Sequence, residues 1–457
     1  MKNITPSPCP CEFHIWEHYA RELMVEYQQC VEEGLDCEKY KSLFESVNQM
    51  PHSQYKEEMA DIISRLVLNM DMRADYEYDE PSELEEIKAK RNLDLLKPCT
   101  GTAVPLEKKI QGAWYGRIIG CLLGKPVECA WTSAIHAVLK SSDNLPMHRY
   151  IKASDLKMDV LEANDAMWLK DRNSYPDIIE CAPFDDDTNY TVMAQCMLDD
   201  YGDTFTPRDV LETWVKYQGR NAYCSAERVA YINYMKHFMP PQTATYQNPY
   251  REWIGAQIRG DYYGYITKNP EKAAELAWRD ASISHIKNGI YGEMLISAML
   301  AGAHTNSNIL DVIYIGLSQI PQKSRLYAQA IELIDDYKNG VKKDEAFKKI
   351  HTIYNYKSSH DWCHTISNAL IVIASLLYGN GDFGKSICMA VETGFDTDCN
   401  GATVGSILGM INGIDSISEE WKAPLKGMLQ TQILGHEKVK IDELVKKTLI
   451  HIEKFDK

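Results

Sequence analysis

Glycine recurs at every fourth position of the segment GAWYGRIIGCLLG, which covers residues 112–124. Its other residues favour a helix, although each interior glycine weakens a helix by about 0.8–1 kcal/mol relative to alanine. Residues four apart share one face of a helix, so this one would carry a strip of bare backbone. The segment NGATVGSILGMINGID repeats the spacing. The glycines are Gly112, Gly116, Gly120 and Gly124, then Gly401, Gly405, Gly409 and Gly413. Such strips let helices approach each other or a neighbouring element more closely than the usual 8–10 Å, so we expect them at the centre of an α-bundle.

Glycines spaced by four also occur in membrane helices that pair. Here Arg117 and Lys125 interrupt the run, and no stretch reaches the roughly 18 apolar residues that a span requires. The start, MKNITPSPCPCEFHIWEH, has neither the apolar core nor the cleavage site of a signal peptide. The 13 cysteines form no CxxC pair, as is typical of free thiols in a reducing compartment. We therefore expect a cytoplasmic protein with no membrane partner.

Charge and periodicity set the class and the domains. A net charge of −16 disfavours nucleic acid as a partner, because phosphate binding needs clustered Lys and Arg. Beyond residue 105, apolar residues recur at helical spacing, and no hairpin or phosphate-binding loop is apparent. The stretch LKPCTGTAVP has the composition of a linker. These features predict an all-α chain, with an N-terminal helical extension over 1–104 and a catalytic domain over 105–457.

Acidic residues gather at two expected helix starts and at the end of the first glycine segment. Three adjacent aspartates in FDDDTNYT precede a helix that we expect to begin near Thr188. A helix N-terminus stabilises a charge by about 0.3–1 kcal/mol, which with solvent accounts for one or two of them but less easily for three. A second pair lies in FDTDCN, and GKPVE adds a glutamate. The residues are Asp185, Asp186, Asp187, Asp396, Asp398 and Glu128.

These six carboxylates together indicate a site for hard divalent cations. Mg²⁺ and Mn²⁺ take oxygen ligands in octahedral geometry, and five or six carboxylates suit two ions about 3.5–4 Å apart. Zinc is disfavoured, because no Cys/His spacing accompanies the acids. We expect two Mg²⁺ ions, with Mn²⁺ as the other candidate, held by all six acids.

Five segments in order are similar to those of the ADP-ribosylglycohydrolase family, over roughly residues 105–435. They are GAWYGRIIGCLLGKPVE, DDDTNYT, SISHIKNGIYGE, HTISNALIVIASLLYGNGDF and GFDTDCNGATVGSILG. The resemblance implies an orthogonal bundle of helices with two Mg²⁺ ions in a central cleft. It also implies metal-binding roles for the paired aspartates, the DTD aspartates and the cleft glutamate, and a ribose contact. The matching residues are Asp186, Asp187, Asp396, Asp398, Glu128 and, for the ribose, His285.

Three departures from the family pattern concern the site. Asp185 and Cys399 each stand where relatives have a ligating Thr or Ser, and a thiol is a poor ligand for Mg²⁺. The family loop that binds phosphate and adenine corresponds to REWIGAQIRGDYYGY, which keeps Gly255, Gln257 and Arg259 but lacks the full glycine set. The leaving group and the nucleotide half of the substrate therefore stay open.

The resemblance implies hydrolysis of an N- or O-glycosidic bond at the distal ribose C1 of an ADP-ribosylated protein side chain or a small ADP-ribosyl or ribosyl conjugate. Such cleavage passes through an oxocarbenium-like state. The expected catalytic residues are Glu128, Asp187 and Asp398. Those expected to contact substrate are His285, Arg259, Gln257, Gly255, Trp362 and His364. His285 as a core histidine and His364 as a helix cap are the open alternatives.

Two other functions are alternatives to a glycosidic hydrolase. A prenyl-diphosphate lyase needs a further aspartate after an Asp-Asp pair, but Asn189 and Tyr190 occupy the two possible positions. A non-catalytic ADP-ribose-binding or toxin-blocking module on the same fold, with the extension as a partner-blocking arm, stays open.

Overall fold

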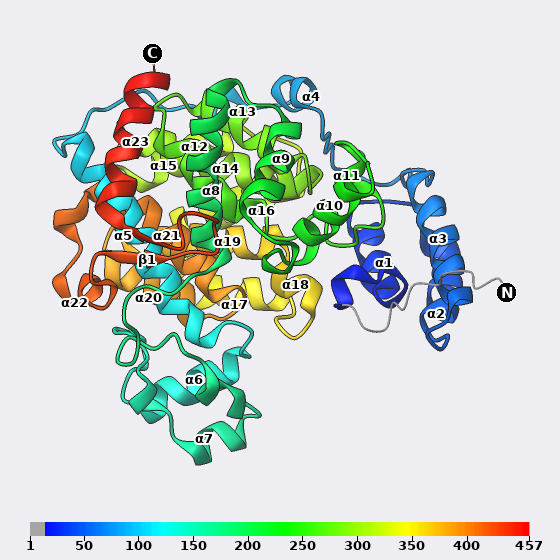
Figure 1. Cartoon of the computed structure of the whole chain (residues 1–457), viewed down its shortest axis with the longest axis horizontal. Coiled ribbons are helices and arrows are strands. Elements are labelled where there is room, and N and C mark those ends of the chain that lie inside the picture. Colours follow the sequence, from blue (N-terminus) through cyan, green and yellow to red (C-terminus); the bar gives the residue numbers. More distant parts are fainter. Residues whose placement is uncertain (1–13, 457) are drawn as a thin grey trace, which may run out of the picture.

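The computed structural model describes residues 14–456 and is built almost entirely of helices (Figure 1). Three lie in the N-terminal extension, and a fourth lies on the way to the bundle. They are α1 (Leu23–Glu32), α2 (Lys41–Asn48), α3 (Gln54–Leu68) and α4 (Leu84–Ala89). The stretch between Leu95 and Leu106 contains no helix, as the linker composition predicts.

The bundle begins with α5, which carries the first glycine strip, and continues through α6 and α7, which project as a small lobe at the bottom of Figure 1. Its first half consists of α5 (Leu106–Gly124), α6 (Thr132–Ser141), α7 (Met158–Ala163), α8 (Asp186–Tyr201), α9 (Pro207–Tyr217), α10 (Ser225–Met235), α11 (Gln242–Thr245), α12 (Asp261–Tyr265) and α13 (Pro270–Ala281).

The second half holds the most buried helices, with α14 almost entirely enclosed. It consists of α14 (Lys287–Ala303), α15 (Ile309–Leu317), α16 (Arg325–Lys338), α17 (Lys343–Ile353), α18 (Ser359–Cys363), α19 (Thr365–Gly379), α20 (Phe383–Glu392), α21 (Thr397–Asn412), α22 (Glu419–Lys422) and α23 (Ile441–Phe455). The prediction of an all-α protein is confirmed.

A small hairpin accompanies the helices. Strands β1 (Met428–Gln430) and β2 (Lys438–Lys440) pair antiparallel, with Leu429 opposite Val439. Sequence patterning gave no sign of it, because three residues a strand are too few to establish an alternation.

The two glycine strips face each other. Helices α5 and α21 run antiparallel, with Gly112 against Gly409, Gly116 against Gly405 and Gly120 against Gly401. A Cβ at Gly116 would lie 2.0 Å from the carbonyl oxygen of Gly405, and one at Gly120 would lie 1.9 Å from that of Gly401. Only glycine allows backbones to meet at this distance, so close approach offsets the low helix propensity. The prediction that the strips serve close packing is confirmed.

No single helix of the described residues is long and apolar enough to cross a membrane. One bent pair, Leu106–Val127 with Thr132–Ser141, meets the length and composition criteria jointly, with a bend of 97°.

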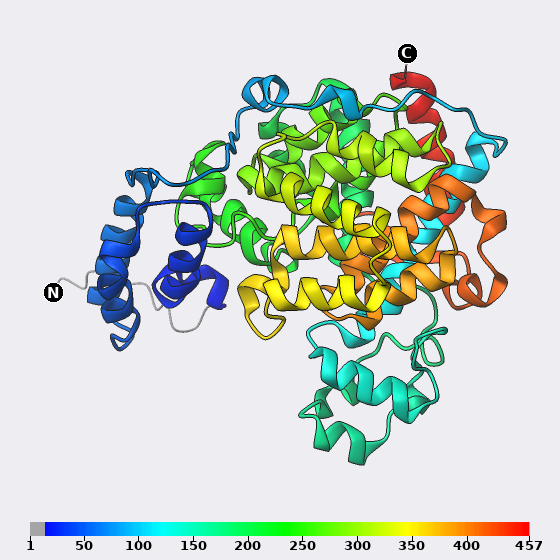
Figure 2. The same ribbon diagram turned by 180° about the vertical axis from the view of Figure 1, so that it is seen from behind.

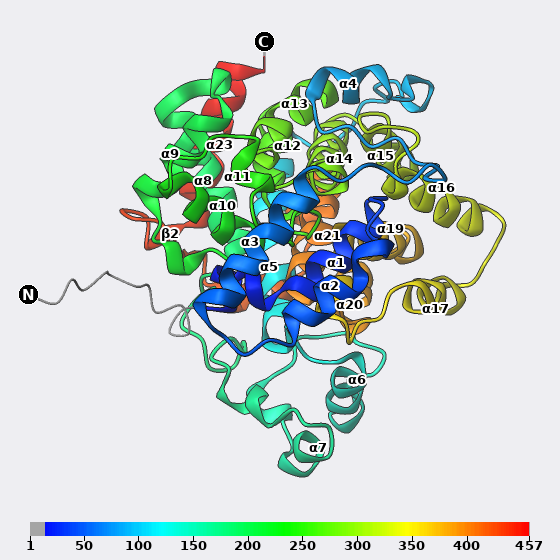
Figure 3. The same ribbon diagram turned by 90° about the vertical axis from the view of Figure 1, so that its right-hand side faces the viewer.

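The N-terminal extension has a small core of its own, formed by side chains such as Leu23, Phe44 and Ile63. The chain then returns across the bundle, where Ile87 of α4 joins the main core. Helices α1–α3 lie at one side of the bundle, as Figures 1 and 2 show from opposite faces, and Figure 3 shows them in front of it.

Buried polar contacts fix the extension to the bundle. Arg251 lies 2.7 Å from Glu26 and also pairs with Glu33, and all three side chains are at most 4% exposed. Beside them, the Gln29 amide donates to Glu252 at 2.7 Å. Removing one partner of a buried ion pair lowers the stability of the folded protein by several kcal/mol. The extension is therefore attached as part of the folded molecule.

Candidate metal centre

The close contact between α5 and α21 brings together chain segments that carry the acids. At the end of α5, Gly124 lies against Thr397, whose hydroxyl donates to the Gly124 carbonyl at 3.0 Å. The N-terminus of α21 is therefore held beside the short 3₁₀ turn Lys125–Val127 that leads to Glu128. Helix α8 begins at Asp186, two residues earlier than expected.

All six predicted carboxylates lie in one cluster at this junction. Burial raises the pKa of Asp398 well above its usual range, and the charges of Glu128, Asp185, Asp396 and Asp187 raise it further. The same causes, with Glu128 as the main neighbour, raise the pKa of Asp396 to about 7. Carboxylates perturb one another in this way only at short range. The acids from three distant segments thus converge.

Asp185 already has two partners within the protein. It caps α8, because its side chain accepts from the Asp187 backbone N–H at 3.0 Å, and its other oxygen pairs with the Lys125 ammonium. Burial alone would raise the pKa of Asp185, but the adjacent Lys125 lowers it. Asp185 therefore stays charged and positions its neighbours.

Asp187 is held from the opposite side by Arg117. The guanidinium donates to Asp187 Oδ1 at 3.0 Å and to Asp261 Oδ2 at 2.9 Å, and all three side chains are fully buried. In the sequence, Arg117 stands out only as a charged residue that interrupts the apolar run. Its position one residue after a strip glycine gives it access to the core beside the acids, and the sequence carried no signal of the partner Asp261.

Two buried oxygens of the cluster, Asp187 Oδ2 and Asp398 Oδ1, have no hydrogen-bond partner among the described residues. Their side chains are 0% and 2% exposed, so water does not replace the missing bonds at the surface. Unpaired buried carboxylate oxygens are costly unless a cation neutralises them. The chemistry of the donor set fits a bound divalent cation.

Thiols lie within the same groups of potential ligands. The ligand atoms of Asp187, Asp398 and Cys399 all lie within 4.8 Å of one another, and so do those of Cys121, Asp185 and Asp187. Asp187 belongs to both groups and therefore lies between two potential ion positions. Cys121 comes from α5 and is not among the residues that the sequence predicts for the site; a thiol inside an apolar helix is also typical of a core residue.

Glu128 and Asp186 form the accessible side of the cluster. The Glu128 side chain is 29% exposed and lies 3.5 Å from the Arg172 guanidinium. Burial raises the pKa of Glu128, although Lys125 opposes the rise. Asp186 is half-buried. A ligand approaching from solvent would meet these two carboxylates first.

A tight turn directs the DTD aspartates. Gly394 and Phe395 have φ angles of 83° and 59°, a conformation that is uncommon for a bulky residue such as Phe395. Asn368 stabilises the turn: its side-chain oxygen accepts from the Asp396 backbone N–H at 3.2 Å, and its amide donates to the Trp362 carbonyl at 2.9 Å. Sequence reasoning missed Asn368, which is fully buried inside HTISNALIVIASLLYGNGDF.

Arg259, predicted to orient phosphate, lies in a different environment. Its guanidinium is 1% exposed and pairs with Glu227 at 2.7 Å and with Asp280. Gly255 leaves room for this arrangement, because a Cβ there would lie 2.0 Å from Glu227. Arg259 and Gly255 are therefore enclosed by other protein groups, and their contact with substrate stays a prediction.

The other predicted substrate contacts differ in accessibility. His285 and Gln257 are buried, with His285 Nδ1 2.8 Å from Ser284 and Gln257 accepting from Thr365 at 3.4 Å. Trp362 is half-buried, and its indole N–H has no partner among the described residues. Of these three, Trp362 is the one with exposed surface for a ligand.

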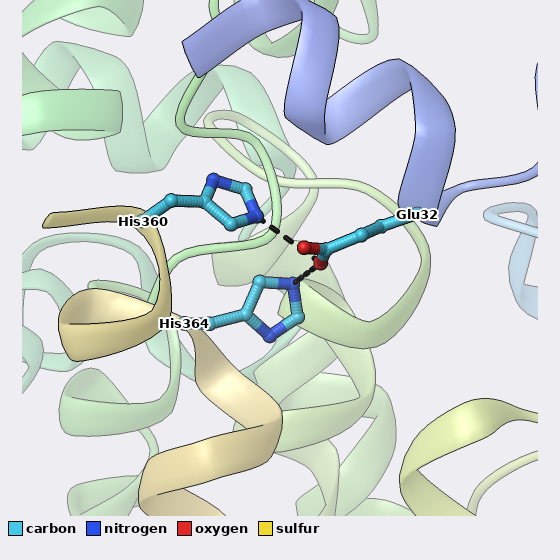
Figure 4. A group of neighbouring side chains, drawn as sticks. All are labelled: Glu32, His360 and His364. Carbon is cyan, nitrogen blue, oxygen red and sulfur yellow. Dashed lines mark hydrogen bonds and ion pairs between the residues drawn. The ribbon is translucent and has the colours of Figure 1, made fainter. Parts of the chain in front are cut away.

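His364 joins a cluster with His360 and Glu32 of the extension (Figure 4). His364 Nδ1 accepts from the Ile366 backbone N–H at 3.1 Å, and His360 Nδ1 accepts from the Trp253 indole at 3.1 Å. Each ring therefore carries its proton on Nε2, and these atoms lie 3.6 and 3.1 Å from Glu32.

With this assignment of protons, His360 donates a hydrogen bond to Glu32 and His364 lies beside the same oxygen; we call these three residues the clamp. A metal-binding histidine donates from its other ring nitrogen, whereas here both other nitrogens accept. Burial alone would raise the pKa of Glu32, but the hydrogen bond and proximity of the histidines lower it to about 2. Burial lowers the pKa of His364 to about 4. His364 thus caps α19 through Nδ1, whereas its Nε2 lies 3.6 Å from Glu32 and has no hydrogen-bond partner among the described residues; its contact with substrate stays a prediction.

A cavity of about 440 Å³ lies away from the acids, and its lining includes Asp382, Phe383 and Trp421. We place the functional site at the acid cluster instead, because that is where buried carboxylate oxygens lack partners.

Comparison with known families bears on this geometry directly. The family model described as ADP-ribosylglycohydrolase matches residues 102–454. The chain belongs to the ADP-ribosylglycohydrolase family. The match includes α5, α8 and α21, the three helices at whose ends the acid cluster lies.

Other comparisons add little. A solved structure described as an ADP-ribosylglycohydrolase-related protein complex is similar over 76% of this chain and 98% of its own, at 16% identity and a TM-score of 0.44. No curated protein matches the sequence significantly. Family membership supports a glycohydrolase-type hydrolase with an all-α fold, and the buried acidic clusters can bind metal.

Proposed function

We propose that this ADP-ribosylglycohydrolase is a metal-dependent hydrolase that cleaves the glycosidic bond at the distal ribose C1 of an ADP-ribosylated side chain or a related conjugate. The observation that carries the proposal is the pair of unpartnered, buried oxygens, Asp187 Oδ2 and Asp398 Oδ1, within a cluster of six acids. Carboxylates so arranged bind divalent cations, and the family match supplies the reaction class.

The carboxylates of Asp187, Asp396 and Asp398 would hold two Mg²⁺ ions, or Mn²⁺. Bound ions of this kind orient substrate hydroxyls and increase the acidity of a coordinated water. Asp185 contributes by keeping the start of α8 in place through its backbone and Lys125 contacts.

Glu128 is the residue proposed to accept the proton of the attacking water. It is accessible, and its raised pKa suits a group that exchanges protons near neutral pH. Burial and the neighbouring carboxylates raise the pKa of Asp186, and a bound cation would favour its ionised form, which would then stabilise the positive charge that develops at C1.

Substrate contacts are proposed for Trp362 and Arg172 at the accessible side. The half-buried indole of Trp362 offers a surface on which a base or ribose can stack. Arg172 is 29% exposed beside Glu128 and is better placed than the enclosed Arg259 to meet a phosphate.

The experiment is a release assay with Mg²⁺ or Mn²⁺ and ADP-ribosylated arginine, serine and small ADP-ribose conjugates. We expect free ADP-ribose from the wild type, and at least about a hundredfold loss in Asp398→Asn and Glu128→Gln, because each removes a group at the reacting centre. The matched control Asp344→Asn changes an exposed carboxylate, with a side chain 90% exposed, and should retain full activity.

The same assay addresses the alternative of a non-catalytic ADP-ribose-binding module. Binding of ADP-ribose without release from any conjugate would support that module and contradict the hydrolase. The buried ion pairs of the extension do not favour a free blocking arm, because such an arm would not depend on a fixed position against the bundle.

A further inference from the structure

The acid cluster contains sulfur as well as oxygen, and this sets it apart from an all-oxygen magnesium site. Cys399 occupies the first turn of α21, directly after Asp398, and is 5% exposed. Its sulfur and the carboxylate oxygens of Asp187 and Asp398 form one group within 4.8 Å. The three residues come from the first turns of α8 and α21.

We propose that Cys399 is a metal ligand, and that the one ion position it shares with Asp187 and Asp398 prefers a thiophilic divalent cation such as Zn²⁺ or Co²⁺ over Mg²⁺. The inference rests on the proposed function in that both require a cation at this cluster. It goes further in assigning the ligand set and the class of ion.

The geometry of the three atoms supports the assignment. With Zn–O bonds of about 2.0 Å and Zn–S bonds of about 2.3 Å, ligand atoms around a tetrahedral ion lie about 3.5 Å apart. Atoms already within 4.8 Å need only a small contraction to reach that spacing. Two of the oxygens in these residues, Asp187 Oδ2 and Asp398 Oδ1, have no other partner among the described residues and are buried.

The choice of ion follows from ligand softness. Thiolates select Zn²⁺ and related transition metals, whereas Mg²⁺ favours oxygen and keeps its waters. Binding through Cys399 exchanges one cation for one thiol proton, which is released to solvent. The sequence disfavoured zinc because no Cys/His spacing accompanies the acids, and only the fold brings the Cys399 sulfur close to Asp187.

The test uses Co²⁺ as the probe, on full-length protein treated first with a chelator. A cobalt–thiolate bond produces a charge-transfer absorption in the near ultraviolet that carboxylate ligands do not. We expect this band to appear in the wild type and to saturate with one Co²⁺ at the Cys399 position. In Cys399→Ser the band should be absent.

Affinities separate a ligand from a merely structural thiol. Cys399→Ser should bind Co²⁺ at least about tenfold more weakly, since even outer-shell partners of a metal are worth about 10–100-fold in affinity. Its Mg²⁺ affinity should be unchanged or stronger, because the serine hydroxyl is an oxygen ligand. Cys388→Ser, a buried thiol of α20 outside the cluster, is the matched control and should keep the band. Circular dichroism and thermal unfolding verify that each variant is folded.

The outcomes distinguish this inference from the proposed function. Co²⁺ binding without a charge-transfer band, or a band that persists in Cys399→Ser and so comes from another thiol such as Cys121, overturns Cys399 as the ligand and leaves the metal-dependent hydrolase standing. Absence of any Co²⁺, Mn²⁺ or Mg²⁺ binding to the wild type overturns both.

Discussion

Replacing Gly116 by alanine tests the physical basis of the whole site, because it adds one methyl group where α5 meets α21. The new Cβ would lie 2.0 Å from the Gly405 carbonyl oxygen and 2.6 Å from its carbonyl carbon. Ordinary contact begins near 3.4 Å, so the two helix backbones would have to separate by more than 1 Å. No side-chain rotation relieves the overlap, since both atoms belong to the backbone.

The magnitude follows from two opposing effects. In an isolated helix this change would stabilise by about 0.8–1 kcal/mol, because alanine is the better helix former. Overpacking a core costs about 1–3 kcal/mol and occasionally more. With backbone atoms as the obstacle, we expect the upper end, a net loss of about 2 kcal/mol or more. The predicted sign is therefore the reverse of the helix propensity.

Urea unfolding followed by circular dichroism measures the change. The control is Gly219→Ala, where φ is −78° and no atom lies within 4 Å of the new Cβ. It should be neutral or stabilising by up to about 1 kcal/mol, through the unfolded chain. The reasoning is refuted if Gly116→Ala is as stable as the wild type or more stable.

Three further changes test the buried charges, each by urea unfolding. Glu32→Gln should destabilise by about 1.5–3 kcal/mol, because its new NH2 group would face either the His360 N–H or the Gln28 amide, which now donate to the two carboxylate oxygens; a loss below about 0.5 kcal/mol would count against the clamp. Arg117→Met should cost about 3–5 kcal/mol by leaving Asp187 buried without its cation, whereas a neutral result would contradict that pairing. Burial lowers the pKa of His364 from 6.5 to about 4. Its contribution to the free energy of unfolding is therefore complete above pH 6.5 and is lost as the pH falls toward 4, with a loss of about 2 kcal/mol by pH 5. The pKa of Asp396, raised to about 7, changes the stability in the opposite sense over part of this pH range. The wild type is therefore compared with His364→Asn, which keeps a capping oxygen and should lack the loss of stability due to His364. Equal pH dependence of the free energy of unfolding in both proteins would exclude the His364 contribution.

Much of the site was predictable because its chemistry is local in the chain. Acidic residues at a helix start, as in DDDTNYT and FDTDCN, identify themselves by type and position, and the glycine spacing indicates which helices can approach. Together these two features indicate that Glu128 and Asp398 approach each other, because they lie at the ends of the two glycine-bearing helices; the position of Asp187 at the start of α8 does not follow from the glycine spacing. The identity of the metal, the number of bound ions and the substrate are proposals.

Residues that act through the core were not predictable in the same way. Arg117 and Asn368 look like ordinary members of apolar helices, and their roles depend on Asp187 and Asp396, which are far away in the sequence. The predicted substrate contact Arg259 shows the converse, since a cation in a suggestive motif is enclosed by Glu227 and Asp280.

The sequence by itself determined that the chain is helical, that two of its helices can touch along bare backbone, and that acids stand at helix starts. These properties depend on residues within a few positions of one another, where periodicity, capping and side-chain size act directly. Only the tertiary structure decided which carboxylate oxygens stay unpaired, that Cys399 and Cys121 lie among them, and that Glu32 clamps two histidines of the bundle. Those outcomes depend on which distant groups compete for each buried donor and acceptor, and that competition is settled by packing.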